Sequence, residues 1–178
     1  MAVHVALLRG INLAGRRRVA MAPLRELLTE RGYADVRTHL QSGNVVLRAP
    51  AGPRGIERDL AEAIEARFGF PVAVIVRSAG QLATVIAEEP FGDEVTEPKL
   101  YQVSFLAGPA PDGTEQRLQA VAAGGERVRV SGREIYTWHP DGVGRSRLAG
   151  ALGARSAGVV ATTRNFRTVC ALAELAAG

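Results

Sequence analysis

Glycine, asparagine and arginine gather in a segment near the N-terminus, and these residue types suit the binding of a phosphate group. Asn12 stands between Gly10 and Gly15, and the basic side chains of the segment are Arg9, Arg16, Arg17 and Arg18. Guanidinium groups bind phosphate through paired hydrogen bonds, and glycine-rich turns add backbone N–H donors. The segment is therefore a candidate phosphate-binding loop. The alternative is a solvated basic loop in which Asn12 only caps backbone groups.

Two further segments carry asparagine beside small or basic residues. The first, Gln41-Ser42-Gly43-Asn44, has the composition of a tight turn, which by itself requires no function. The second, Thr162-Thr163-Arg164-Asn165, precedes an apolar run with helical spacing, so we expect either threonine to cap that helix. Capping does not account for the arginine or the asparagine, and the amides at a helix start bind anions. The candidate ligand-binding residues in these segments are Ser42, Asn44, Arg164 and Asn165.

A fourth segment, residues 142–147, combines two glycines with Arg145, Ser146 and Arg147. Its composition is compatible with anion binding. The sequence favours a plain loop instead, in which Ser146 caps the helix that follows.

Signatures of the common cofactor and metal sites are missing from the sequence. Asn12 stands where the dinucleotide fingerprint G-x-G-x-x-G requires its second glycine, and Asp35 precedes the next expected strand instead of ending it. There is neither a P-loop nor a G-x-S-x-G motif. The three histidines lie far apart and lack the spacing of metal ligands. We therefore expect no cofactor and no metal, and the catalytic residues of any reaction stay unknown.

Composition limits the class of protein. The chain has 178 residues, of which 47% are hydrophobic and 22% charged, as in ordinary globular proteins. It contains no apolar run close to the roughly 20 residues that span a bilayer, and no signal-peptide pattern. Its single cysteine suits a reducing compartment. We expect a cytoplasmic protein without a membrane partner, and the sequence leaves its oligomeric state open.

Charge is distributed unevenly along the chain. The formal net charge is +4, with basic side chains in excess in residues 1–78 and 127–178 and acidic ones in excess in 79–126. This asymmetry allows one face to attract phosphate, although the net charge is modest for a dedicated nucleic-acid binder. The first and third expected strands lack the aromatic residues on which a sheet face stacks RNA bases.

The first half of the chain predicts the order β-α-β-β-α-β, which is the ferredoxin-like order. A strand at 3–8, a helix after Pro23, a hairpin over 36–48, a helix at 56–68 and a strand at 72–76 follow one another. With right-handed crossovers, the loop after the first strand, the turn at 42–44 and the connection at 69–71 emerge at one edge of the sheet. We therefore expect Asn12 and Asn44 to lie close together.

The second half predicts a smaller α+β unit. A helix around Leu82 leads into an acidic connection at 88–98, and a strand at 100–106, a helix near Leu118 and a hairpin at 128–138 follow. The last 35 residues read as helical. We expect an α+β protein with two subdomains, residues 1–78 and 79–178.

Taken together, the asparagine motifs resemble the signature of the domain-of-unknown-function family 1697. They are Arg9-Gly10-Ile11-Asn12 with Gly15, Gln41-Ser42-Gly43-Asn44, and Thr162-x-Arg164-Asn165-x-x-Thr168, so the resemblance extends over nearly the whole chain. It implies an α+β fold of two subdomains, the first ferredoxin-like, in a bacterial cytosolic protein without an established activity. It also implies that the positions to test are Arg9, Asn12, Ser42, Asn44, Arg164 and Asn165.

The residues leave three functional hypotheses open. The first is a binding module whose polar edge accepts a phosphate-bearing ligand, either a nucleotide or a single-stranded nucleic acid. The second is an enzyme acting on a small phosphorylated or carboxylated metabolite, for which the sequence offers no obvious general base. The third is a structural or regulatory interaction protein in which the asparagines only fix loops.

Overall fold

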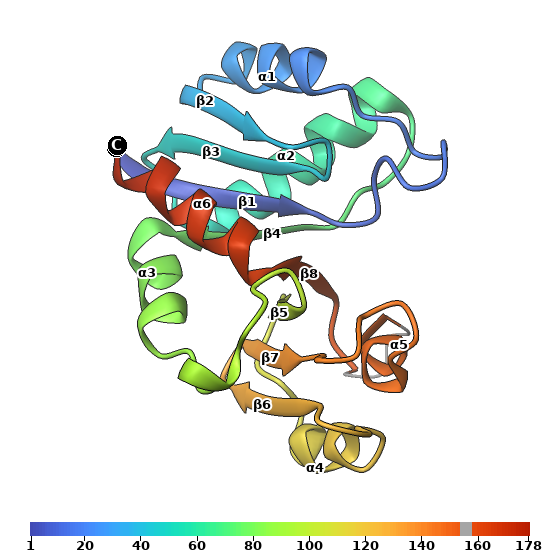
Figure 1. Cartoon of the computed structure of the whole chain (residues 1–178). Helices are drawn as coiled ribbons and strands as arrows, with labels where there is room; N and C mark the ends of the chain where they lie inside the picture. Colours follow the sequence, from blue (N-terminus) through green and yellow to red (C-terminus); the bar gives the residue numbers. More distant parts are fainter. Residues whose placement is uncertain (154–157) are drawn as a thin grey trace. The chain divides into compact units, whose positions relative to one another are not determined.

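A computed structural model describes residues 1–153 and 158–178, which form a mixed α+β fold with two four-stranded antiparallel sheets and six α-helices (Figure 1). The chain divides into two compact units. Unit 1 comprises Met1–Thr84 with Ala171–Gly178, and unit 2 comprises Val85–Cys170. The division into subdomains 1–78 and 79–178 stays a prediction. Within the described residues, every helix is too short or too polar to cross a membrane.

Unit 1 contains the β-α-β-β-α-β order that the sequence predicts. Its strands and helices are β1 (Ala2–Leu8), α1 (Met21–Glu30), β2 (Ala34–His39), β3 (Asn44–Ala49), α2 (Pro53–Phe68) and β4 (Val74–Ser78), followed by α3 (Ala79–Ala87). The sheet has the order β2-β3-β1-β4, and all neighbouring strands are antiparallel. Leu7, near the end of β1, pairs with Asn44 at the start of β3 and with Ile75 near the start of β4. The end of β1 and the starts of β3 and β4 therefore share one edge.

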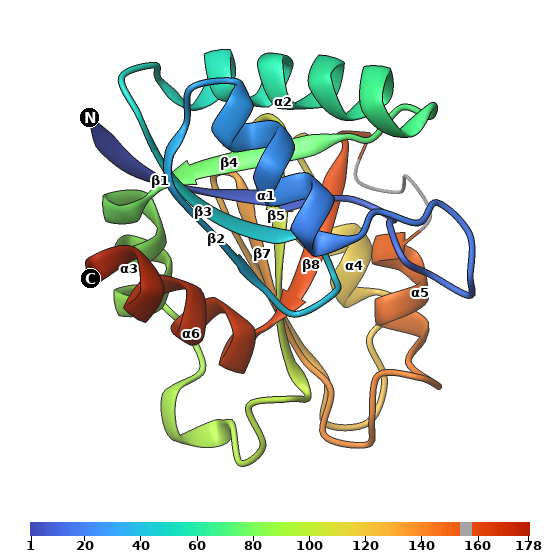
Figure 2. The same ribbon diagram turned by 90° about the horizontal axis from the view of Figure 1, so that it is seen from above.

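One face of this sheet is covered by α1 and α2 (Figures 1 and 2). Side chains of a strand alternate between the two faces, and Ala6 and Leu8 of β1 point to the helix side. The helices contribute apolar side chains spaced three or four residues apart, which are Leu24, Leu28, Ile56, Leu60 and Ile64. Each of these side chains is buried. Full burial of such a side chain stabilises the fold by about 1.5–3 kcal/mol.

Proline and glycine mark the ends of these helices. Pro53 is the first residue of α2, where a missing N–H costs nothing. Gly69 caps the end of α2 with φ +81°, and Gly32 follows α1 with φ +91°. These left-handed conformations favour glycine, because a Cβ atom would meet the backbone.

His4 is a buried residue of β1, and its two ring nitrogens have no hydrogen-bond partner within the described residues. Burial lowers the pKa of His4 below its ordinary value of 6.5. The unfolded chain therefore binds a proton more readily than the folded protein, and the free energy of unfolding falls as pH drops through 6.5.

We expect His4→Leu to raise the free energy of unfolding by about 1 kcal/mol at pH 7, because two unpaired polar atoms leave the core. The gain should grow towards pH 5, where the original protein must keep its imidazole neutral to remain folded. Urea unfolding of both proteins across this pH range measures the difference. A pH dependence as steep in the variant as in the original protein would contradict the assignment.

Unit 2 forms a second sheet with the strand order β6-β7-β5-β8. Its elements are the 3₁₀ helix η1 (Gly92–Glu94), β5 (Tyr101–Leu106), α4 (Thr114–Gln119), β6 (Arg127–Ser131), β7 (Glu134–Trp138), α5 (Arg147–Gly153) and β8 (Ala161–Asn165), and α6 (Phe166–Ala177) begins in this unit. Leu118 of α4 and Leu148 of α5 pack in one apolar cluster with Leu106, Val128 and Ile135 from the strands.

The prediction that the last 35 residues are helical is wrong for residues 161–165. These residues form β8, which pairs with the central strand β5 from Ala161↔Leu106 to Asn165↔Gln102. The β-branched Thr162 and Thr163 suit a strand, but five residues give too short a pattern to separate a strand from the start of a helix. Residues 154–157 of the predicted helical segment lie outside the described residues.

Candidate functional site

The segment between β1 and α1 folds into a small hairpin that projects from the end of the sheet in unit 1 (Figures 1 and 2). Leu13 and Arg16 form a bridge, and the N–H of Asn12 donates to the carbonyl of Arg17 at 3.1 Å. Ala14 and Gly15 form the turn with φ +47° and +76°. A two-residue turn with both φ values positive matches the twist of a hairpin, and glycine accepts it readily. The residues 12–17 are called the basic hairpin below.

Asn12 fixes the base of the basic hairpin. Its Oδ1 accepts a hydrogen bond from the N–H of Val19 at 2.9 Å, and its Nδ2 donates to the carbonyl of Val19 at 2.9 Å. The same Nδ2 donates to the carbonyl of Gln41 at 2.6 Å. The side-chain amide thus joins the two ends of its own loop to the turn between β2 and β3.

The turn between β2 and β3 packs against the end of β1. The N–H of Leu8 donates to the carbonyl of Gly43 at 2.8 Å. Asn44 is buried, and its Nδ2 donates to the carbonyl of His39 and to Oγ of Ser42, both at 2.9 Å. The predicted proximity of the first two asparagine motifs is therefore present, but both amides hold protein groups in place.

The arginines of the loop extend into solvent. Arg16, Arg17 and Arg18 are exposed, and within residues 1–153 and 158–178 no hydrogen bond or ion pair engages their side chains. Arg9 is half-buried, and its N–H donates to the carbonyl of Ala73, just before β4. The predicted convergence of the connection before β4 with the loop is thus confirmed. The result is a cluster of positive charges on a fixed backbone.

The third asparagine motif lies in unit 2, on β8. The prediction that a threonine caps α6 is wrong, because Thr162 and Thr163 belong to the strand. Asn165 takes this role, since its Oδ1 accepts a hydrogen bond from the N–H of Thr168 at 2.8 Å. Arg164 donates from Nη1 to Oγ1 of Thr162 at 2.8 Å and to the carbonyl of Thr163 at 2.9 Å, and desolvation lowers its pKa to about 10. The participation of Arg164 and Asn165 in the ligand site stays a prediction.

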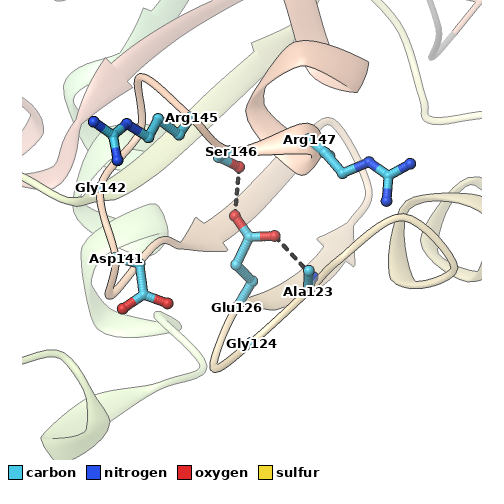
Figure 3. A pocket seen from close by; sticks show the side chains of 8 residues that line it. All are labelled: Ala123, Gly124, Glu126, Asp141, Gly142, Arg145, Ser146 and Arg147. Atoms are coloured by element: carbon cyan, nitrogen blue, oxygen red, sulfur yellow. Dashed lines mark hydrogen bonds between the residues drawn. The ribbon is translucent and has the colours of Figure 1, made fainter.

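Unit 2 also contains a pocket of about 260 Å³, which the sequence did not predict (Figure 3). Its lining combines small residues with charged and polar side chains: Ala123, Gly124, Glu126, Asp141, Gly142, Arg145, Ser146 and Arg147. One part of this lining, the segment 142–147, has a composition that is compatible with anion binding. The predicted role of Ser146 as a helix cap is confirmed. Its Oγ accepts a hydrogen bond from the N–H of Ala149 at 2.9 Å. No sequence motif indicated a role for Glu126, because the residues that it contacts are distant from it in the sequence.

A buried polar cluster forms the floor of this pocket. Ser146 donates its hydroxyl to Oε1 of Glu126, and His139 Nδ1 lies 3.0 Å from the same oxygen and 2.9 Å from Oγ of Ser146. Nε2 of His139 lies 2.9 Å from Oγ1 of Thr137. Activation of a serine requires the hydroxyl on one ring nitrogen and the carboxylate on the other. Here both face Nδ1, so the cluster positions side chains and is not a catalytic triad.

Comparisons with known proteins agree with the resemblance noted in the sequence. A search of curated proteins gives no match. Among solved structures, the chain is similar to the conserved bacterial protein SP0830 from Streptococcus pneumoniae, with a TM-score of 0.77 and 18% sequence identity over 98% of each chain. At this identity the similarity concerns the fold. The model of the family described as "Protein of unknown function (DUF1697)" matches residues 1–136, and the chain therefore belongs to this family.

Proposed function

We propose that unit 1 binds a phosphate-bearing ligand, a single-stranded nucleic acid, through the basic hairpin and its flanking arginines. The observation that carries the proposal is the run Arg16-Arg17-Arg18, which is exposed and without side-chain partners in the described residues, on a loop held by Asn12. If these three arginines only stabilised the fold, we would expect their side chains to be paired with acidic groups or packed against the protein. Exposed guanidiniums on a fixed backbone are suited to contact phosphate oxygens.

The shape of the loop supports a polymer over a small nucleotide. The three arginines belong to a projecting hairpin and its C-terminal end (Figure 1), and their exposure allows them to contact successive phosphates of a chain. Leu13 and Leu40 add exposed apolar surface, with 66% and 58% of their surface accessible. A preorganised loop also reduces the entropy lost on binding. A single nucleotide would engage only part of this surface.

The other predicted site residues support the loop in this proposal. Arg9 contributes charge beside the hairpin. Asn12 joins its loop to the turn between β2 and β3, and Asn44 with Ser42 fixes that turn from within. Arg164 and Asn165 are further positions at which substitutions should be tested for an effect on ligand binding. We expect the protein to be cytoplasmic. The strand order β2-β3-β1-β4 supports the assignment of a ferredoxin-like first subdomain.

Replacing Arg16, Arg17 and Arg18 together by alanine is expected to weaken binding of a fluorescent single-stranded oligothymidylate about tenfold or more near physiological salt. Each neutralised phosphate contributes roughly 0.7 to the slope of log K against log salt for single strands, so three lost contacts should reduce the slope by about two. Fluorescence anisotropy titrations at several salt concentrations measure both quantities.

The matched control removes the same charge from a different surface of unit 1. Arg54, Arg58 and Arg67 are exposed on α2, and their triple alanine variant should keep most of the affinity and the slope. Equal losses in both variants would reduce the effect to overall charge and contradict a site at the hairpin. Absence of oligothymidylate binding by the original protein at low salt would reject the proposal.

The hypothesis of a structural interaction protein has one specific observation in its favour. The amides of Asn12 and Asn44 are engaged with protein groups, as that hypothesis requires. The two hypotheses differ in what they predict for Arg16, Arg17 and Arg18. If the protein has only a structural role, replacing these arginines should leave oligothymidylate binding unchanged.

A further inference from the structure

The pocket of unit 2 carries a second set of unpaired charges, apart from the basic hairpin. Arg145 and Arg147 are exposed, and within the part of the chain that the structure describes their side chains have no hydrogen-bond or ion-pair partner. They extend from opposite sides of the Glu126–Ser146 pair (Figure 3). The two side chains point away from each other, so each guanidinium by itself offers its N–H donors at the rim of the cavity, where the terminal oxygens of a phosphate can use them (Figure 3).

The same pocket offers hydrogen-bond acceptors. The carboxylate of Asp141 lines it without a hydrogen-bond or ion-pair partner among the described residues. Glu126 is buried in the floor and accepts hydrogen bonds from Ser146 and from the N–H of Ala123, the latter at 2.9 Å to Oε2. A carboxylate oxygen has room for more than one donor. Hydroxyl groups of a ligand can therefore donate to Asp141 and to Glu126.

Because the pocket contains both signs of charge, a ligand that is only anionic does not suit it. The carboxylates repel a bare anion, and the arginines repel a cation, so the complementary molecule has an anionic end and a neutral, hydroxyl-rich end. The volume of about 260 Å³ is slightly below the range of drug-sized pockets and suits a small metabolite.

We propose that this pocket binds a phosphate monoester that carries neighbouring hydroxyl groups, as in a sugar phosphate or a mononucleotide. The guanidinium of Arg145 or that of Arg147 binds the phosphate, and Asp141 with Glu126 accepts hydrogen bonds from the hydroxyls. The site lies within unit 2 and does not depend on nucleic-acid binding by unit 1. It is a binding site, and the geometry assigns no reaction to it.

The floor of the pocket is preorganised for this role. His139 is fully buried and contacts Glu126, Ser146 and Thr137, so the Glu126 carboxylate is held in one position. The turn below it is closed by a hydrogen bond from the N–H of Glu126 to the carbonyl of Ala123 at 3.1 Å. A fixed acceptor reduces the entropy that a small ligand must lose on binding.

Isothermal titration of the full chain with ribose 5-phosphate, AMP, ribose, inorganic phosphate and L-glutamate tests the assignment. We expect ribose 5-phosphate or AMP to bind, and inorganic phosphate and ribose to bind at least tenfold more weakly. Binding of AMP alone identifies the ester as a nucleotide and supports the same chemistry. Equal binding of inorganic phosphate and the esters, tighter binding of L-glutamate, or no binding of either ester would each overturn the proposal.

Variants locate the bound ester. Replacing Arg145 and Arg147 together by glutamine should reduce the affinity at least tenfold, and Asp141→Asn should reduce it several-fold. The charge-matched control replaces Arg54 and Arg167, which are exposed on α2 and α6, and should bind as the original protein does. Urea unfolding of each variant verifies that it is folded. Full affinity in the folded Arg145/Arg147 variant would reject the pocket as the site.

Discussion

Gly43→Ala is expected to lower the free energy of unfolding by about 2–4 kcal/mol. A Cβ atom at this position would lie 2.7 Å from Cδ1 of Ile11 and 2.7 Å from Cβ of Leu8, and real Cβ atoms do not approach other atoms so closely. Overpacking of this kind costs about 1–3 kcal/mol. Gly43 also has φ +77°, a left-handed conformation that costs alanine about 1 kcal/mol more than glycine. Denaturant unfolding followed by circular dichroism measures the loss.

Gly69→Ala separates the two contributions. Gly69 has φ +81°, but apart from its two chain neighbours no described residue has a heavy atom within 4 Å of the Cβ that alanine would introduce. This variant should lose only about 1 kcal/mol, the cost of the backbone conformation. Equal losses for Gly43→Ala and Gly69→Ala would show that the turn between β2 and β3 is not packed against the end of β1 as described.

The same substitution connects stability to the proposed site. Ile11 precedes the basic hairpin, and Gly43 lies two residues from Gln41, whose carbonyl binds Asn12. Displacement of Ile11 by an added methyl group therefore moves the base of the hairpin. Under conditions where Gly43→Ala is folded, we expect weaker oligothymidylate binding than for Gly69→Ala.

Glu126→Ala is expected to lower the free energy of unfolding by about 3 kcal/mol or more. The side chain of Glu126 is only 8% exposed and that of His139 is fully buried, so the partners left behind cannot all turn to water. Ala123, Ser146 and His139 would each lose a hydrogen-bonding partner. Each buried polar group that is left without a partner typically costs about 1–3 kcal/mol.

Acidification should reproduce part of this loss. Desolvation acts to raise the pKa of Glu126, but the hydrogen bonds from Ser146, Ala123 and His139 together bring it below its ordinary value of 4.5. A carboxyl group with a lowered pKa stabilises the fold above the unfolded pKa, and this contribution disappears as pH falls through the folded pKa. The difference in unfolding free energy between the original protein and Glu126→Gln should therefore shrink below about pH 4.5.

The control for Glu126→Ala is Asp93→Ala, which removes an exposed carboxylate of the same unit. This variant should stay within about 0.5 kcal/mol of the original protein, as surface substitutions usually do. Comparable, small effects for both variants would contradict a buried cluster under the pocket. Urea unfolding at pH 7 and at several acidic pH values provides all of these comparisons.

Local patterns predicted the elements of unit 1 and part of the site. Apolar residues at helical spacing from Ile56 to Phe68 indicate α2, and Ser42-Gly43-Asn44 indicates the turn that the structure contains. These signals are local, because a helix buries one stripe of its own surface and a turn satisfies its own backbone. Strand order and right-handed crossovers then brought Asn12 beside Gln41 in the prediction as in the structure.

Contacts between distant residues decided what the local patterns could not. Residues 161–165 read as the start of a helix, yet they form a strand because β5 offers an unpaired edge, and Thr163 hydrogen-bonds Ser104 across 59 positions at 2.7 Å. Glu126 gave no signal of its own, because its role depends on His139 and Ser146, which are distant in sequence.

The β-α-β-β-α-β order of unit 1, the meeting of its loops at one edge and the family of the chain could all be predicted from the order of the amino acids. The folded chain was needed to show that the Asn12 and Asn44 amides bind protein groups, that Arg16, Arg17 and Arg18 extend into solvent, and that unit 2 contains a polar pocket. The difference lies in the range of the interactions. Helix stripes, caps and turns are encoded within a few residues, whereas the partner of a buried polar group is set by whatever the folded chain brings within hydrogen-bond distance.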